Sequence, residues 1–82
     1  MYILIYSQDA VKQIKKLPKN IQQRIISTLE RCRIRPYAHV KKLAASNYFS
    51  LRTGNYRVIM DIQDDKLRIL VIELGHRKNI YK

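Results

Sequence analysis

The residues best suited to chemistry are a group of cations, an imidazole and a phenol in the last third of the chain. Arg57 lies in a run with strand character, and His76, Arg77, Lys78 and Tyr81 follow the next such run. This set predicts cleavage of RNA without a metal, because the ribose 2′-hydroxyl is itself the nucleophile. The protein would remove its proton, neutralise the phosphorane and assist the leaving 5′-oxygen. Arginine suits the second task, since its planar guanidinium grips phosphate oxygens and stays charged.

Two side chains of this set can move a proton, and the sequence leaves the choice between them open. Surrounding cations favour the phenolate of Tyr81, as a general base requires. His76 can act as an acid or a base without a special environment. Each residue also has a structural explanation, because a tyrosine near a chain end often packs and a histidine after a strand often lies on the surface.

A predicted hairpin, residues 48–62, must position Arg57. Gly54 and Asn55 are favoured in two-residue turns, because both tolerate positive φ. Counting outward from this turn places Arg52 opposite Arg57, and the alternation of side chains gives the strands two distinct faces. The predicted open, polar face carries Tyr48, Ser50, Arg52, Arg57 and Ile59, and the predicted core face pairs Phe49 with Met60 and Leu51 with Val58.

The pairing of Arg52 with Arg57 is unfavourable in an isolated sheet. Directly opposed like charges destabilise a strand pair by roughly 0.2–1 kcal/mol. Two arginines on one face therefore suggest an anion that both bind. The alternative is that both side chains extend separately into water.

The rest of the chain predicts the elements that surround the hairpin. Residues 2–6 predict a strand covered on both faces, and Ser7 can cap the helix that follows. Pro18 separates this helix from a second one, which ends before Pro36. The apolar stripes of the two helices are Ala10, Val11, Ile14 and Leu17, then Ile21, Ile25, Ile26, Leu29 and Cys32.

After the helices, residues 36–47 predict a connecting segment anchored by Leu43. Residues 63–66 predict a polar turn, and residues 67–74 predict a strand that is apolar on both faces and ends at Gly75. The expected fold is a single α+β domain, residues 1–82, in two layers. An N-terminal strand and a two-helix antiparallel pair pack on a mainly antiparallel four-stranded sheet in the order β-α-α-β-β-β.

The charge of the chain indicates a polyanionic partner. Seventeen lysines and arginines against six acidic residues give a formal net charge of +11, more than solubility requires. Nucleic acid is the leading candidate, and an acidic protein can share the same surface. No predicted helix has the broad apolar face of a membrane binder, and no run approaches the roughly 20 apolar residues that span a bilayer. A cytoplasmic protein without a membrane partner is expected.

Neither a metal nor another cofactor is predicted. His39 and His76 lack cysteine or carboxylate neighbours at ligand spacing, and the two glycines of the chain form no phosphate-binding loop. Cys32 lies on the apolar side of a predicted helix, where a buried thiol is expected.

The chain resembles the RelE/ParE superfamily of toxin–antitoxin systems, and within it the RelE-like mRNA interferases, the archaeal type included. The resemblance spans nearly the whole sequence. It is carried by Lys16-Leu17-Pro18, Lys42-Leu43, Leu51-Arg52-Thr53-Gly54-Asn55-Tyr56-Arg57-Val58, and Leu74-Gly75-His76-Arg77 with Ile80-Tyr81. RelE-like members are ribosome-dependent endoribonucleases that cut messenger RNA in the A site, and a small antitoxin wraps around each and holds it inactive.

This resemblance assigns roles to individual residues. Arg57 resembles the family arginine that stabilises the transition-state phosphate, Arg77 the one near the leaving oxygen, and Tyr81 the proposed base. The chain departs from the family where Tyr48 and Ser50 replace lysines, and in the short interval between Arg77 and Tyr81. His76 is kept as a further catalytic candidate. The expected RNA-binding residues are Arg52, Lys41, Lys42, Ser50, Tyr48, Lys78, Lys12, Lys15, Lys16, Lys19 and Arg24.

The resemblance therefore implies a toxin that cleaves mRNA on the ribosome and forms a hetero-oligomer with an acidic, RelB-like antitoxin. Arg52, Lys41 or Lys42 must replace the missing strand lysines. One alternative is a ParE-like toxin of the same fold that poisons DNA gyrase without hydrolysing anything. Another is a module without catalytic activity whose basic surface serves its antitoxin or generic RNA.

Overall fold

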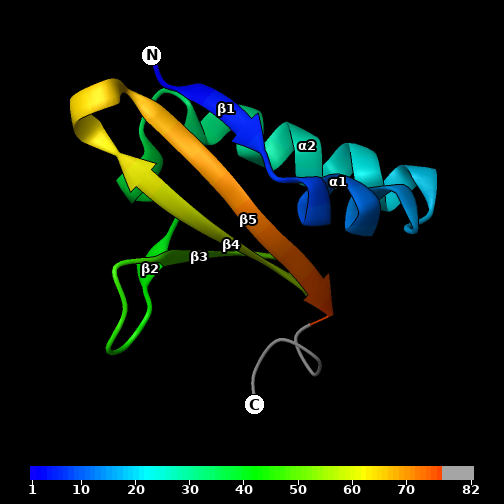
Figure 1. The fold of residues 1–82 in the computed structure, drawn as a ribbon. Coiled ribbons are helices and arrows are strands. Elements are labelled where there is room, and N and C mark those ends of the chain that lie inside the picture. Colours follow the sequence, from blue (N-terminus) through cyan, green and yellow to red (C-terminus); the bar gives the residue numbers. More distant parts are fainter. Residues whose placement is uncertain (77–82) are drawn as a thin grey trace.

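The computed structural model describes residues 1–76, arranged as two helices and five strands (Figure 1). Arg77, Lys78 and Tyr81, which the sequence places in the site, lie outside the described residues. In chain order the elements are β1 (Ile3–Tyr6), α1 (Gln8–Lys15), α2 (Lys19–Cys32), the 3₁₀ turn η1 (Pro36–Ala38), β2 (Lys41–Lys42), β3 (Phe49–Thr53), β4 (Tyr56–Gln63), the 3₁₀ turn η2 (Asp64–Lys66) and β5 (Arg68–His76).

The strands form one mixed sheet in the order β1-β5-β4-β3-β2. β1 runs parallel to β5, whereas the other neighbours are antiparallel. The two-layer α+β expectation is confirmed, but the expectation of four strands is wrong. The fifth strand, β2, lies in the segment 36–47 that was predicted to be a simple connection. Its two lysines have little strand propensity, and β2 exists because its backbone pairs with Ser50 and Phe49.

Both helices bury an apolar stripe against the same face of the sheet. Ala10 and Ile14 of α1 join Ile25, Leu29 and Cys32 of α2 in one core cluster with the inward side chains of the strands. As expected, Cys32 is fully buried, and this burial raises the pKa of its thiol. Within residues 1–76, no helix has the length and apolar character needed to cross a bilayer.

The predicted hairpin register is confirmed. Arg52 is opposite Arg57, and Thr53 is opposite Tyr56. Of the two turn residues only Gly54 adopts a positive φ, of 60°. Glycine is suited to this conformation because it has no Cβ to clash with the backbone.

A β-bulge in β5 decides which residues accompany Arg57. The register is Ile59 with Glu73 but Met60 with Val71, so Ile72 is an extra residue. The extra residue reverses the alternation of faces beyond it. The backbone N–H of Leu74 there donates to Oε1 of Gln13 in α1, at 2.7 Å.

Because of this bulge, Leu74 faces the core and Gly75 lies directly opposite Arg57. β5 therefore continues through Gly75 to His76, and the expectation that the strand ends at Gly75 is wrong. Gly75 remains within the ladder, directly opposite Arg57.

Candidate functional site

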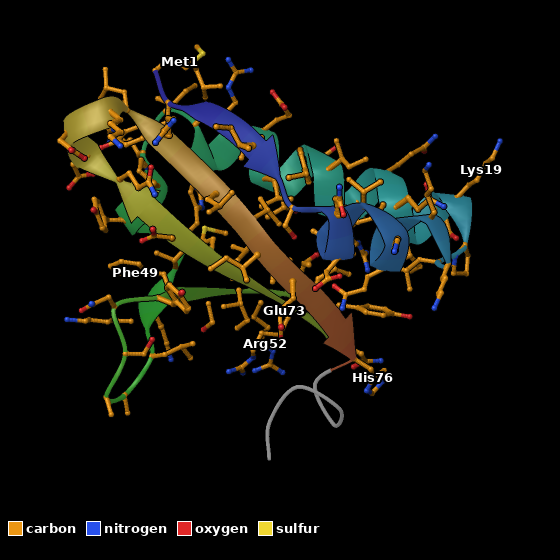
Figure 2. All side chains as sticks on the ribbon, viewed as in Figure 1. Met1, Lys19, Phe49, Arg52, Glu73 and His76 are labelled. Carbon is orange, nitrogen blue, oxygen red and sulfur yellow. The ribbon has the colours of Figure 1, made fainter. Side chains whose placement is uncertain are left out.

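A cavity of about 570 Å³ lies beside β2, β3 and β4 on the face of the sheet away from the helices. Its polar lining consists of His39, Lys41, Lys42, Ser46, Ser50, Arg52 and Arg57, with Leu43 and Ala44 completing the wall. We refer to this site as the cation pocket. Figure 2 shows Arg52 projecting from the sheet on the side opposite the helices. A volume of several hundred Å³ is typical of sites that hold a small ligand.

Arg57 is buried in the cation pocket, although it is a charged residue. Its exposed fraction is 8%, and that of Ser50 is 9%. The expectation of an open, polar face is therefore wrong for this part of the sheet. β2 pairs alongside β3, with Lys41 directly across from Ser50, and the segment after β2 contributes further wall residues.

The cation pocket gathers positive charge without a carboxylate among the described residues that line it. Glu73 lies directly opposite Ile59, but it is exposed and does not line the pocket (Figure 2). Two lysines and two arginines around one cavity repel one another. An anion that enters the cavity would offset this repulsion, and a phosphodiester fits the forked donors of arginine.

The pocket also supplies the cations that were missing from the strand. The resemblance led us to expect lysines at the positions of Tyr48 and Ser50, and therefore a replacement from elsewhere. Lys41 lies across from Ser50, and Lys42 and Arg52 line the same cavity. Backbone pairing of β2 thus brings lysines to β3 from a segment some ten residues earlier.

Two predicted site residues lie elsewhere. Tyr48 precedes β3, is 43% exposed and does not line the pocket. His76 is directly opposite Tyr56, and the two rings make an edge-to-face contact with centroids 5.7 Å apart. Since Tyr56 packs against the core cluster, the register places His76 on the helix-covered face rather than on the face of Arg57.

The predicted helix cations form a second basic surface. Their side chains are exposed on the helices, and the helices cover the face of the sheet opposite the cation pocket. In Figure 2, Lys19 extends from the far end of the helical layer. The residues concerned are Lys12, Lys15, Lys16, Lys19 and Arg24.

Comparison with known proteins identifies the family. Residues 4–81 match the family model of the ParE toxin of type II toxin–antitoxin systems. The chain belongs to this family. Within the RelE/ParE superfamily it is RelE-like, since Toxin RelE3 of Methanocaldococcus jannaschii is 30% identical over 84 residues that cover 95% of this chain and 93% of that protein.

Solved structures agree with a RelE-like fold. This chain matches a chain of the RelB–RelE antitoxin–toxin complex from Methanococcus jannaschii with a TM-score of 0.75 and 28% identity, and the match covers 95% of each chain. The archaeal RelE–RelB complex from Pyrococcus horikoshii gives a TM-score of 0.84 at 24% identity, covering 95% of this chain and 97% of that one. The RelE/ParE expectation is therefore confirmed.

Sequence reasoning missed two polar residues of the cation pocket, His39 and Ser46. His39 was considered only as a metal ligand and set aside, yet it lines the cavity with Lys41 and Arg57. A signal was available, because His39 and Lys41 flank the apolar Val40 and must point away from it if the segment is extended. That signal depended on recognising β2, which the sequence did not reveal.

Proposed function

We propose that this chain is the toxin of a type II toxin–antitoxin system and a ribosome-dependent endoribonuclease that cuts messenger RNA in the A site. The observation that supports the proposal is the cation pocket, which surrounds the buried Arg57 with further cations and no described carboxylate. The family supplies the biological context, because the relatives are named RelE toxins.

In the proposed reaction, the ribose 2′-oxygen attacks the adjacent phosphorus and the bond to the 5′-oxygen breaks. The products are a 2′,3′-cyclic phosphate and a 5′-hydroxyl. Arg57 stabilises the charge that accumulates on the phosphorane, and Arg52, Lys41 and Lys42 hold the message. Preorganised donors at a developing charge are usually a large part of an enzyme's rate enhancement. Arg77 keeps the role near the leaving oxygen that the family resemblance implies, and the resemblance offers Tyr81 as one candidate for the base.

The proposed partners follow from the charge distribution. The acidic surface of an antitoxin fits a chain of net charge +11, and the M. jannaschii and P. horikoshii neighbours were each solved with RelB. We therefore propose a hetero-oligomer with a RelB-like antitoxin in the cytoplasm. The second basic surface, on the helices, would bind ribosomal RNA while the cation pocket binds the message.

The decisive experiment is primer extension on translating ribosomes with purified protein. Cuts confined to the A-site codon, and absent when naked message is used, are the expected result. Intact message at toxin concentrations that saturate the ribosome would overturn the proposal.

The two basic surfaces predict a separation between binding and cleavage. Lys15→Ala combined with Lys16→Ala should weaken ribosome affinity and reduce the dependence of affinity on salt, because each lost phosphate contact removes roughly 0.7–0.9 from the slope of log K against log salt. The cleavage rate on saturated ribosomes should stay within threefold of wild type. Binding titrations at several salt concentrations and single-turnover cleavage measure the two effects, and a saturated rate that falls with affinity would contradict this division.

A second candidate function is a ParE-like gyrase poison that hydrolyses nothing. One observation favours it: the matching family model is that of ParE toxins. It also agrees with the presence of Tyr48 and Ser50 where the resemblance led us to expect strand lysines. DNA cleavage complexes trapped on gyrase, with message left intact, would support this alternative. The fold is common to both functions and cannot separate them.

A further inference from the structure

We propose that His39 is the general base of the cation pocket and removes the proton of the attacking 2′-hydroxyl. This inference rests on the proposed function and deepens it. It assigns a role to a residue that neither the sequence motifs nor the family resemblance singled out. The reasons lie in where His39 is held and in what the other side chains of the pocket can do.

The segment before β2 holds His39 at the pocket. Pro36 of η1 is buried, and the Tyr37 ring makes an edge-to-face contact with Phe49 of β3, with centroids 5.4 Å apart. The Tyr37 hydroxyl donates to Oδ2 of Asp64 at 2.7 Å. The backbone N–H of His39 donates to the carbonyl of Pro36 at 3.3 Å. The imidazole is thus attached to an anchored turn rather than to a free loop.

The next residues fix the side of the sheet on which His39 lies. Val40 packs against the core cluster, and Lys41 pairs with Ser50 on the opposite face. His39 precedes Val40 and lines the cavity together with Lys41 and Arg57. It therefore stands among the cations that would surround a bound phosphodiester.

The chemical argument is that the described pocket is rich in proton donors and poor in proton acceptors. Lysine ammonium and arginine guanidinium groups have no acceptor atom, and arginine does not lose its proton in proteins. Ser46 and Ser50 carry hydroxyls, which are weak bases. Among the described side chains that line the pocket, the neutral His39 imidazole is the one with a ring nitrogen that accepts a proton.

The reaction balances with this assignment. Neutral His39 takes the proton as the 2′-oxygen forms its bond to phosphorus, and the imidazolium later returns this proton to solvent. The electron pair of the breaking bond stays on the 5′-oxygen, which receives a proton from a lysine ammonium or from water. No oxidant, reductant or metal is needed.

The first test is single-turnover cleavage on saturated ribosomes between pH 5.5 and 8.5. Wild type should show a rate that rises with pH to a plateau, because neutral imidazole is the active form. His39→Gln keeps similar size and polarity but cannot accept a proton. It should lower the rate by about 10²–10⁴, the usual contribution of general base catalysis, remove the rising limb and leave ribosome affinity within threefold. A variant within threefold of the wild-type rate would overturn the proposal.

A second test separates chemistry from packing. Added imidazole should restore part of the rate of His39→Ala, since a free base can occupy the vacated space, and it should not accelerate wild type. A message with sulfur in place of the 5′-oxygen at the scissile bond should not rescue this variant. Rescue by the sulfur leaving group would show that His39 acts as an acid and would overturn the assignment as base.

His76 offers the matched comparison, because it is the other histidine of the chain. We expect His76→Gln to retain the rising limb of the pH profile that His39→Gln loses. The reverse result would move the base to His76 and overturn the proposal. Inorganic phosphate added to the ¹⁵N-labelled free toxin provides a readout without the ribosome, and the side-chain resonances of His39 should shift more than those of His76.

These tests also distinguish a failure of the proposed function from a failure of the assignment of His39 as the base. If wild type cuts no message on ribosomes, the proposed function fails, and the base falls with it. If wild type cuts and both His39 variants cut equally well, only the assignment of His39 fails.

Discussion

Two polar clusters meet at η1, and they are built on opposite principles. Tyr37, within η1, belongs to a cluster in which the Asp64 carboxylate accepts hydrogen bonds from the hydroxyls of Tyr2 and Tyr37, at 2.8 and 2.7 Å. His39, two residues later, belongs to the cation pocket. The first cluster matches each donor with an acceptor, whereas the second gathers like charges around a cavity.

The two clusters differ in charge: the first combines hydrogen-bond donors with a carboxylate, whereas the second gathers cations. This difference distinguishes structural from functional polar groups. The phenol–carboxylate cluster lowers the energy of the folded chain by itself, because its groups are paired within the protein. The described residues that line the pocket include four lysines and arginines and no carboxylate, so an anion that enters would be attracted to it. Residues that lower stability in the free protein and are held together by the fold are characteristic of functional sites. Substitutions in the two clusters should therefore affect different properties.

After His39, the largest expected effect is on cleavage and comes from Arg57. Arg57→Ala should lower the rate on saturated ribosomes by about 10²–10³, the usual cost of removing one transition-state donor. Arg57→Lys keeps the charge but loses the planar fork, so it should recover only part of this loss. Because Arg57 is buried, thermal unfolding and ribosome binding of both variants are needed as controls. A folded, ribosome-bound Arg57→Ala protein that cuts at the wild-type rate would remove Arg57 from the chemistry.

The position of Arg57 is one of the features that could be predicted from the sequence. Period-two alternation and a glycine-containing turn were enough to predict the hairpin register, the Arg52 and Arg57 pair and the inward side chains, because strand geometry links these features directly to residue spacing. The helices followed from apolar stripes, the Ser7 cap and the break at Pro18 in the same way. Local rules therefore gave the layers and the central cations.

The features that the sequence did not reveal depend on long-range pairing. β2 is two lysines that become a strand only beside β3, and the β5 bulge is visible only when β4 and β5 are aligned. β2 brings Lys41 and the preceding His39 to the cation pocket, and the bulge places Gly75 opposite Arg57. The alternation of side chains along the predicted strands, taken without these two features, predicted an open face and did not place His39 at the pocket.

Breaking the phenol–carboxylate cluster should have a smaller effect, and on stability rather than rate. Tyr37→Phe removes one hydrogen bond of an exposed carboxylate, worth about 0.5–1 kcal/mol in such a setting. The melting temperature should fall by about 4 °C for a domain of this size, with cleavage within a few-fold of wild type. Differential scanning calorimetry and single-turnover cleavage test the two halves of this expectation.

The same variant gives a pH test with a definite sign. Partial burial and the hydrogen bond to Asp64 raise the pKa of Tyr37 from 10.0 to about 12. The folded state thus holds the phenolic proton more tightly than the unfolded state, so this contribution to stability is fully present below pH 10 and is lost as pH rises toward 12. The difference in melting temperature between wild type and Tyr37→Phe should shrink over this interval. A difference that stays constant to pH 12 would show that folding does not raise the pKa of Tyr37.

The smallest expected effect tests the contrast between the two clusters most directly, because the substitution should raise stability while it weakens cleavage. Arg52 is exposed and directly opposes Arg57. Arg52→Gln should therefore raise the free energy of unfolding by roughly 0.2–1 kcal/mol, through relief of like-charge repulsion, while it weakens cleavage by loss of a phosphate contact. Added salt should reduce the stability gain, since it screens the repulsion that the substitution relieves. Urea unfolding at low and high salt measures this gain. A variant that is both less stable and less active would mean that favourable contacts within the chain hold Arg52 in place. The cation pocket would then not differ from the phenol–carboxylate cluster in the way described above.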